Sequence, residues 1–273
     1  MRKGDCVVKR LISANASDIS KFTKEELKQS IKASEGRTVL SENIVVHDPA
    51  LVLDVTNAEM ATAFGADMIL LNAFDVVNPE IKGLYNKEYQ GTGEPIKDLK
   101  NLVGRPIGVN LEPVDDEAKM AESKLEISYG RKATEKTFKH ANELGFDFVC
   151  LTGNPATGVT NLNILEAIET AKNHFDGLII AGKMHGSGVD EAVKVAHQHG
   201  ALVMSAIGTS QESADESTIK EMAIKNKTLG VDIQHIGDAG YGGLAPVENI
   251  YALSKAIRGQ RHTVSRIARS INR

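Results

Sequence analysis

The chain of 273 residues has no tryptophan and only 4% aromatic residues, so branched aliphatic side chains and alanine must fill its core. The two cysteines, Cys6 and Cys150, lie far apart, which argues against a disulfide framework and favours a reducing compartment. No apolar run approaches the roughly 18 residues of a membrane span, and no apolar stretch follows the basic N-terminus. A net charge of -4 argues against general nucleic-acid binding. We therefore expect a cytoplasmic protein with neither nucleic-acid nor membrane partners.

What the chain does contain is a recurring unit, in which a helical segment ends in glycine and a short turn leads into an apolar run. Gly65, Gly145, Gly200 and Gly230 each occupy this position. Glycine is the usual residue at a helix end because it enters the left-handed conformation without a steric penalty. The runs that follow are apolar on both faces, as in buried parallel strands: 68–72, 146–152, 201–205 and 231–237.

Three further strands are predicted at 38–42, 106–112 and 177–183, which makes seven. An even succession of strands and helices over this length predicts an α/β fold, a (β/α)8 TIM barrel forming a single domain over 1–273. The eighth strand lies near 6–13 or the barrel is incomplete; an open doubly wound sheet is the alternative. Residues 1–36 are predicted to form a peripheral helical extension.

In a barrel, the carboxyl ends of all strands face one mouth, where active sites lie. The polar residues predicted there are Glu42, Asn72, Asn110, Glu112, Thr152, Asn154, Lys183, His185, Ser205, His235 and Asp238. A single residue of this kind could simply cap a helix or form an ion pair. Their joint occurrence at apolar strand ends predicts a ligand site.

Lys183 follows the apolar run 178–182, which would carry its amine to the mouth. A partly desolvated lysine can form a Schiff base with a carbonyl substrate. It could equally bind an anion, or pair with Glu112 or Asp238. His185, two residues further on, and Glu112 are the predicted proton-transfer groups.

Two glycine-containing loops precede late helices, a position at which backbone N–H groups bind anions. Gly208 and Thr209 belong to the first loop, and Gly242 and Gly243 to the second. We predict a phosphate or carboxylate subsite there; two tight turns are the alternative reading. No cofactor is required by this scheme. In a second scheme, a divalent metal is held by carboxylates and imidazoles: Glu42, Glu112, His185, His235 and Asp238.

The irregular segment 75–95 follows a strand, and we predict that it forms a mobile lid to which a second such segment, 113–130, can contribute. A surface insertion is the alternative for the first segment. The tail 262–273 is basic with an apolar stripe that includes Val264, Ile267 and Ile271. We expect a packed or subunit-bridging helix, and hence a homo-oligomer.

The stretch 57–67 before the second strand resembles phosphonomutase-like and photosystem-biogenesis-type barrels. The strand-borne Lys183 with glycine-rich late loops resembles class I aldolases. These resemblances imply a phosphate-binding barrel, or a barrel family distinct from both, and they transfer no catalytic residue.

Together these features predict a lyase or isomerase that acts on a small phosphorylated or carboxylated carbonyl compound. A metal-dependent hydrolase or lyase using the same mouth is one alternative. A non-catalytic ligand-binding barrel is the other.

Overall fold

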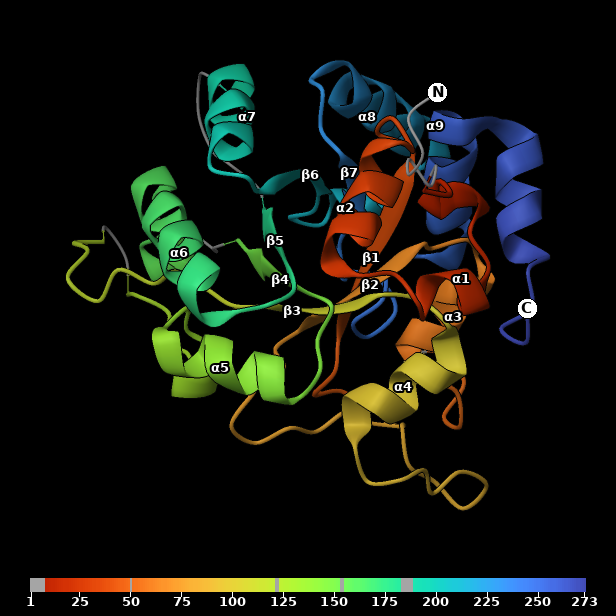
Figure 1. The fold of residues 1–273 in the computed structure, drawn as a ribbon, viewed down its shortest axis with the longest axis horizontal. Coiled ribbons are helices and arrows are strands. Elements are labelled where there is room, and N and C mark those ends of the chain that lie inside the picture. The colour runs from red at the N-terminus through yellow and green to blue at the C-terminus, as the bar shows by residue number, and fades with distance from the viewer. Residues whose placement is uncertain (1–7, 50, 121–122, 153–154, 183–188) are drawn as a thin grey trace, which may run out of the picture.

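The computed structural model describes residues 8–49, 51–120, 123–152, 155–182 and 189–273. Seven parallel strands form a closed ring, in which each strand pairs with the next and β7 pairs with β1 (Figure 1). Their bounds are β1 Thr38–Ile44, β2 Met68–Asn72, β3 Ile107–Asn110, β4 Phe148–Leu151, β5 Leu178–Ala181, β6 Leu202–Ile207 and β7 Ile233–Ile236.

The predicted fold class, a TIM-type α/β barrel, is confirmed, and all seven predicted strands are present. The ring closes without an eighth strand. In the described part of the region where one was expected, Leu11–Ser13 form a single turn of 3-10 helix. The pairing of Thr38 with Ile233 joins the first and last strands directly.

The strands alternate with helices that surround the ring (Figure 1). The helices are α1 Ala16–Ile19, α2 Lys24–Lys32, α3 Asn57–Ala63, α4 Pro95–Val103, α5 Glu135–Glu143, α6 Asn161–His174, α7 Val189–Gln198, α8 Glu216–Thr228 and α9 Val247–Ile267. Helix α4 was not predicted from the sequence. Helix α9 runs on into the basic tail across a kink at Gly259, whose φ is 73°. Among the described helices, none is both long and apolar enough to cross a membrane.

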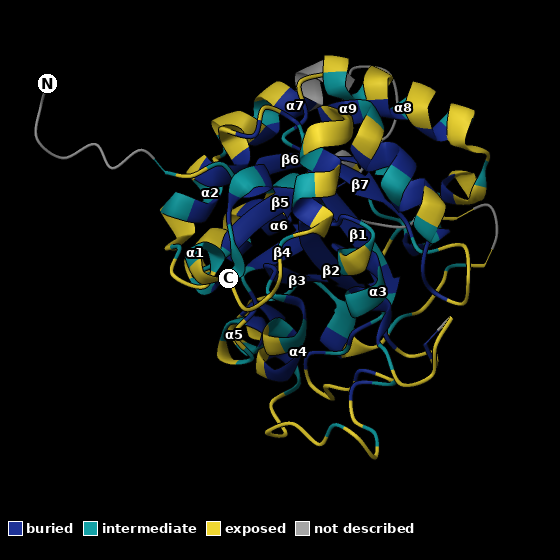
Figure 2. Cartoon of the chain, turned by 90° about the vertical axis from the view of Figure 1, so that its right-hand side faces the viewer, coloured by how far each residue is buried: buried dark blue, intermediate teal, exposed yellow. Residues whose placement is uncertain are grey.

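The barrel has an inner and an outer apolar layer, and its strands are buried on both faces (Figure 2). Inside the ring, Leu40, Met68 and Phe148 pack against Leu27 and Ile31 of α2. A Cβ on Gly108 would lie 2.2 Å from the Phe148 ring, so glycine in β3 makes room for that ring. Helix α2 and Phe148 therefore fill the interior and leave the polar side chains to the other end of the barrel.

An aspartate in the turn before a strand recurs at three points of the ring. The carboxylates of Asp67, Asp147 and Asp232 each accept a hydrogen bond from a backbone N–H at or next to the start of the preceding strand, at 2.8–2.9 Å. Each also contacts a basic side chain: Asp67 pairs with Arg258 and Arg266, Asp147 with Lys100, and Asp232 lies 2.7 Å from His197 Nε2. The recurring unit of the sequence thus carries a recurring link between neighbouring strands.

The two segments predicted to form a lid are tied to each other. Ser128 donates to the Asp75 carboxylate at 2.6 Å, and the Val76 N–H donates to Gly130 O at 3.2 Å. Val76, Ile81 and Leu84 of the first segment are buried in the outer core. The first segment is therefore anchored at several points along its length, and closure over the mouth stays a prediction for its exposed tip near 86–93.

Candidate active site at the mouth of the barrel

Three adjacent strands bring four of the predicted residues together at the mouth. Glu42 lies on β1, Asn72 ends β2 and His235 lies on β7, and both β2 and β7 pair with β1. Asp238 follows the end of β7 by two residues. Because β1 lies between its two partners, these side chains meet in one place although nearly 200 residues separate the first from the last.

His235 and Glu42 form a close pair. The Nε2 atom of His235 lies 2.9 Å from the Glu42 carboxylate, and the two side chains are 5% and 12% exposed. The other ring nitrogen, Nδ1, is buried and has no hydrogen-bond partner in the described part of the chain. Glu42 therefore fixes the orientation of the imidazole and leaves one ring nitrogen for a further contact.

Asp238 is held by an amide on the other side of β1. The Asn72 side-chain nitrogen donates to the Asp238 carboxylate at 2.8 Å. The Asn72 oxygen accepts the N–H of Ala73 at 2.8 Å, and the Asn110 amide lies 3.5 Å from the same oxygen. Ala73 has a φ of 59°, which is rare for alanine and marks local strain. This backbone conformation fixes the Asn72 amide so that its NH2 group faces Asp238.

The surroundings of Asp238 favour its protonated form. Burial and the nearby Glu42 carboxylate raise the pKa of Asp238 from 3.8 to about 6, against the opposing effects of the Asn72 hydrogen bond and His235. Glu212 adds to the rise. A carboxyl group with a pKa near 6 can exchange a proton at neutral pH, as a general acid or base must.

Glu212 is a residue of this region that the sequence analysis missed. It lies in the short turn Gln211–Ser213 after β6 and is 2% exposed. Its carboxylate accepts the N–H of Ala239 at 3.0 Å, and a Cβ on Gly237 would lie only 2.4 Å from it. Read from the sequence, a glutamate in a polar loop indicates a surface position. In the sequence, Gly237 was the residue that could have indicated a close neighbour at this point.

Glu112 and Thr152 follow the ends of β3 and β4. Glu112, just beyond β3, pairs with Arg131 at 3.0 Å and is 6% exposed in its side chain. Its backbone bonds to Arg131 and Ala133, which places the 131–133 segment against it. Thr152 lies over Gly182, where a Cβ would come within 2.2 Å of the threonine Cβ.

Ser205 lies away from the mouth. Its hydroxyl donates to Ile233 O at 3.4 Å and to the Gln234 side chain at 3.3 Å. Its neighbours of the same parity, Val203 and Ile207, belong to the outer core. Ser205 therefore faces the helices. Lys183, His185 and Asn154 lie outside the described residues.

Both glycine loops contain residues in the left-handed conformation, and the second already has an acidic side chain bound to its backbone. Thr209 and Ser210 have φ values of 60° and 72°, and Gly242 and Gly243 have 61° and 98°. Gly243 is buried against Ile44, and its carbonyl accepts the Ile44 N–H at 3.0 Å. The Glu212 carboxylate already binds a backbone N–H of the second loop, and its charge would repel an anion there. The anion subsite at Gly208, Thr209, Gly242 and Gly243 stays a prediction.

Within the described residues, no group of three or more His, Cys, Asp or Glu side chains is arranged to hold a metal ion. His185, one member of the predicted metal set, lies outside them.

Cys150, on β4, is fully buried inside the ring, and burial followed by the Glu42 charge raises its pKa well above the usual value. It is an unreactive thiol of the barrel interior.

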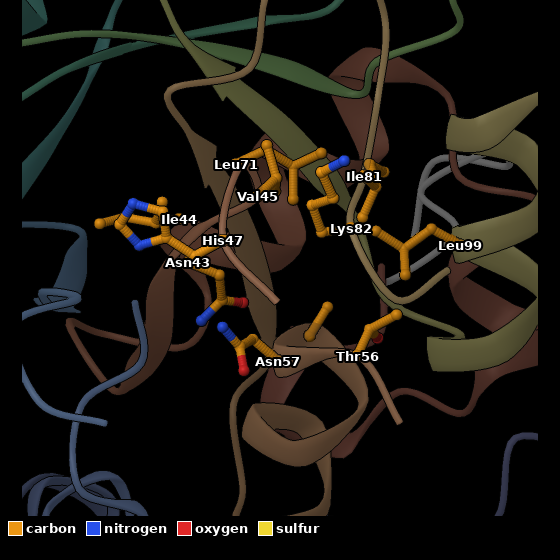
Figure 3. Close-up of a pocket in the computed structure, with 11 residues that line it drawn as sticks. Asn43, Ile44, Val45, His47, Thr56, Asn57, Leu71, Ile81, Lys82 and Leu99 are labelled. Atoms are coloured by element: carbon orange, nitrogen blue, oxygen red, sulfur yellow. The ribbon is translucent and has the colours of Figure 1, made fainter. Parts of the chain in front are cut away.

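A cavity beside the mouth is too small for a substrate. It lies between the end of β1, α3 and the 81–82 segment (Figure 3). Asn43 and Asn57 lie at one edge, and His47 and Lys82 also line it. Its volume of about 10 Å³ accommodates about one water molecule. The candidate site is therefore the barrel mouth itself.

Comparison with known proteins assigns a family. A family model described as a domain of unknown function (DUF7916) matches residues 12–193 and 189–273, and the chain belongs to that family. No curated protein matches the sequence.

Similar solved structures include 3-hexulose-6-phosphate synthase from Salmonella typhimurium, with 13% identity, 81% of this chain and 98% of that chain covered, and a TM-score of 0.42. KGPDC from Streptococcus mutans has 13% identity, 81% and 99% coverage, and a TM-score of 0.40. 3-Dehydroquinate dehydratase from Aquifex aeolicus VF5 has 12% identity, 81% and 99% coverage, and a TM-score of 0.42. Similarity this low transfers neither an activity nor a residue role to this chain.

Proposed function

We propose that this barrel is an enzyme that transfers a proton on a small carbonyl compound bearing a carboxylate or phosphate group, as a lyase or isomerase does. The observation that carries the proposal is Asp238. Its carboxyl group lies at the mouth, has a pKa of about 6 and is held by the fixed amide of Asn72.

Asp238 has the proton affinity that the chemistry requires. A group with this pKa is largely ionised at pH 7, yet accepts a proton more readily than an ordinary aspartate. It would remove a proton from carbon next to the carbonyl and return it to the product. The Asn72 N–H that donates to Asp238 keeps the carboxylate in one orientation during both steps.

His235 is the proposed second polar contact to the substrate. Its Nε2 atom faces Glu42, which leaves Nδ1 directed elsewhere. In its doubly protonated form, with the Nε2–H donated to Glu42, the imidazole would donate its Nδ1–H to the carbonyl oxygen as negative charge develops there. Glu42 has two effects: it orients this ring and it raises the pKa of Asp238. Glu42 is thus a positioning residue.

Lys183 supplies the positive charge in this proposal, on the basis of its place after the β5 run. It would attract the anionic group of the substrate to a mouth in which Glu42, Glu212 and Asp238 are acidic. In the Schiff-base form of the proposal, its amine condenses with the carbonyl and releases water. Glu112, paired with Arg131, would line the same mouth.

To test the proposal, the protein is incubated in D2O with a panel of 2-oxo acids and phosphorylated aldehydes and ketones. NMR would report deuterium at carbon next to the carbonyl, or conversion of the compound. We expect at least one compound to react, and Asp238→Asn to slow that reaction by about 10²-fold or more. Asp54→Asn, at an exposed aspartate in the loop before α3, is the control.

Two results would contradict the proposal. An equally active Asp238→Asn variant would remove the proposed acid–base group. A compound that binds at the mouth but neither exchanges nor reacts would favour the non-catalytic ligand-binding barrel.

A further inference from the structure

A groove lies at the other end of the barrel, where the strands begin. It is bounded by α1, α4 and the turn between α5 and β4, and it has a volume of about 380 Å³. Figure 2 shows α1, α4 and α5 at the lower left of the molecule. The volume falls within the usual range for small-molecule sites, about 300–1,000 Å³. Arg105 and Asp147, which line it, precede β3 and β4, whereas the candidate active site follows β7.

One wall of the groove is apolar. Ile19 and Phe22 line it from the α1 side, and Leu144 lines it from the end of α5. Ile19 and Phe22 also pack against the inner core and Leu144 against the outer core, so the barrel holds all three in place. A ligand with an apolar body would remove further apolar surface from water here.

The residues of α4 and of the turn after it bring three cations to the groove, and two of them already have partners. Lys100 pairs with Asp147 at 2.7 Å and donates to Gly145 O at 2.6 Å. Lys97 pairs with Glu94 on the outside of the same helix. The third cation, Arg105, is only 3% exposed.

The hydrogen bonds of Arg105 go to carbonyl groups. Its guanidinium donates to Gly104 O at 3.0 Å and to Ala66 O at 3.4 Å. In the described part of the chain it forms no salt bridge. A buried guanidinium bonded only to neutral carbonyls keeps an uncompensated charge.

The charged groups around Arg105 are mostly positive as well. Of the four charged groups that act most strongly on Arg105, three are arginines: Arg258, Arg266 and Arg269. The fourth is Asp67, which is already paired with Arg258 and Arg266. Burial and these arginines lower the pKa of Arg105 to about 9. An anion in the groove would offset both the cost of burying the Arg105 charge and its repulsion by the neighbouring arginines.

We infer that this groove binds a small organic anion, whose carboxylate pairs with Arg105 and whose apolar part lies against Ile19, Phe22 and Leu144. The inference does not rest on the proposed activity at the mouth. It identifies a second ligand site, for an amphipathic monocarboxylate, at the opposite end of the barrel.

Octanoate is a suitable probe because it combines one carboxylate with an apolar chain. NMR titration of the intact protein would follow the backbone amides of Gly104 and Gly145, which line the groove. We expect saturable shifts at both amides. Octanol and octylamine, with the same chain but no negative charge, should bind at least about tenfold more weakly, because each lacks the charge-assisted hydrogen bond.

Arg105→Gln should weaken octanoate binding by about tenfold or more, whereas Lys220→Gln on α8 removes a surface cation elsewhere and should leave it unchanged. If Arg105→Gln does not fold, Lys97→Glu is the second test. This variant adds a negative charge at an exposed position of the groove and should also weaken octanoate binding. Absence of shifts at Gly104 and Gly145 up to about 10 mM octanoate would overturn the inference. So would equal binding of octanol, or wild-type affinity in the folded arginine or lysine variant.

Discussion

Asp238→Asn should make the protein more stable at neutral pH. In the wild type, burial and Glu42 raise the pKa of Asp238 from 3.8 to about 6. Folding therefore holds a carboxylate in a setting that disfavours its charge. At about 1.4 kcal/mol for each pKa unit, the cost of ionised Asp238 is at most about 3 kcal/mol. The side chain is partly exposed to water, so we expect a gain of about 1–3 kcal/mol in the free energy of unfolding at pH 8.

The pH dependence of this gain follows from the sign of the shift. Below the unfolded-state pKa of 3.8, Asp238 is protonated in both states and costs nothing. As the pH rises toward 6, the unfolded chain ionises first, and the wild type loses stability relative to the variant. Above the folded-state pKa of about 6 the difference is constant.

Urea unfolding at pH 4 and pH 8 measures the effect for wild type, Asp238→Asn and the control Asp54→Asn. The variant should gain stability at pH 8 and little at pH 4, and the control should follow the wild type. A variant that is less stable than wild type at pH 8, or a gain of equal size at both pH values, would show that folding does not disfavour the charge of Asp238.

Three further predictions follow from the same electrostatics. Asp67→Asn leaves two fully buried arginines without their carboxylate, so it should cost about 3–5 kcal/mol in urea unfolding; a loss below about 1 kcal/mol would contradict the role given to this pair. Glu42→Gln removes the nearby negative charge and should lower the pKa of Asp238 in a ¹³C NMR titration, whereas an unchanged value would contradict the contribution assigned to Glu42 beside that of burial. Lys183→Ala should weaken binding of the anionic ligand, and borohydride with the carbonyl substrate should label Lys183 in the Schiff-base form of the proposal; unchanged binding and activity would remove Lys183 from the site.

Four of the strands were predictable because a glycine that ends a helix marks where the next apolar run begins. Gly65 and Gly145 have φ values of 109° and 82°, as helix-ending glycines require. The helix starts carry an equally clear local signal, since Thr23 with Glu26 and Thr56 with Glu59 form capping boxes. The expected eighth strand is not found in the described residues, because seven strands already close the ring around a large inner side chain, Phe148.

The site was harder to predict because strands buried on both faces do not reveal which side chains point inward. Ser205 and His235 both lie in apolar runs, yet one faces the helices and the other the barrel interior. The hydrogen bond between Asn72 and Asp238 spans 166 residues, and the pKa shift of Asp238 depends on its burial and on the two carboxylates that fold beside it. Such effects arise from tertiary packing and leave no local pattern in the sequence.

The most direct test of the central claim is a ¹³C NMR titration of the Asp238 carboxyl carbon in the wild-type protein, assigned by its loss in Asp238→Asn. The account predicts a midpoint at about pH 6, in the range where an acid–base catalyst operates. A midpoint near the ordinary aspartate value of 3.8 would contradict it, because Asp238 would then lack the proton affinity on which the proposed function depends.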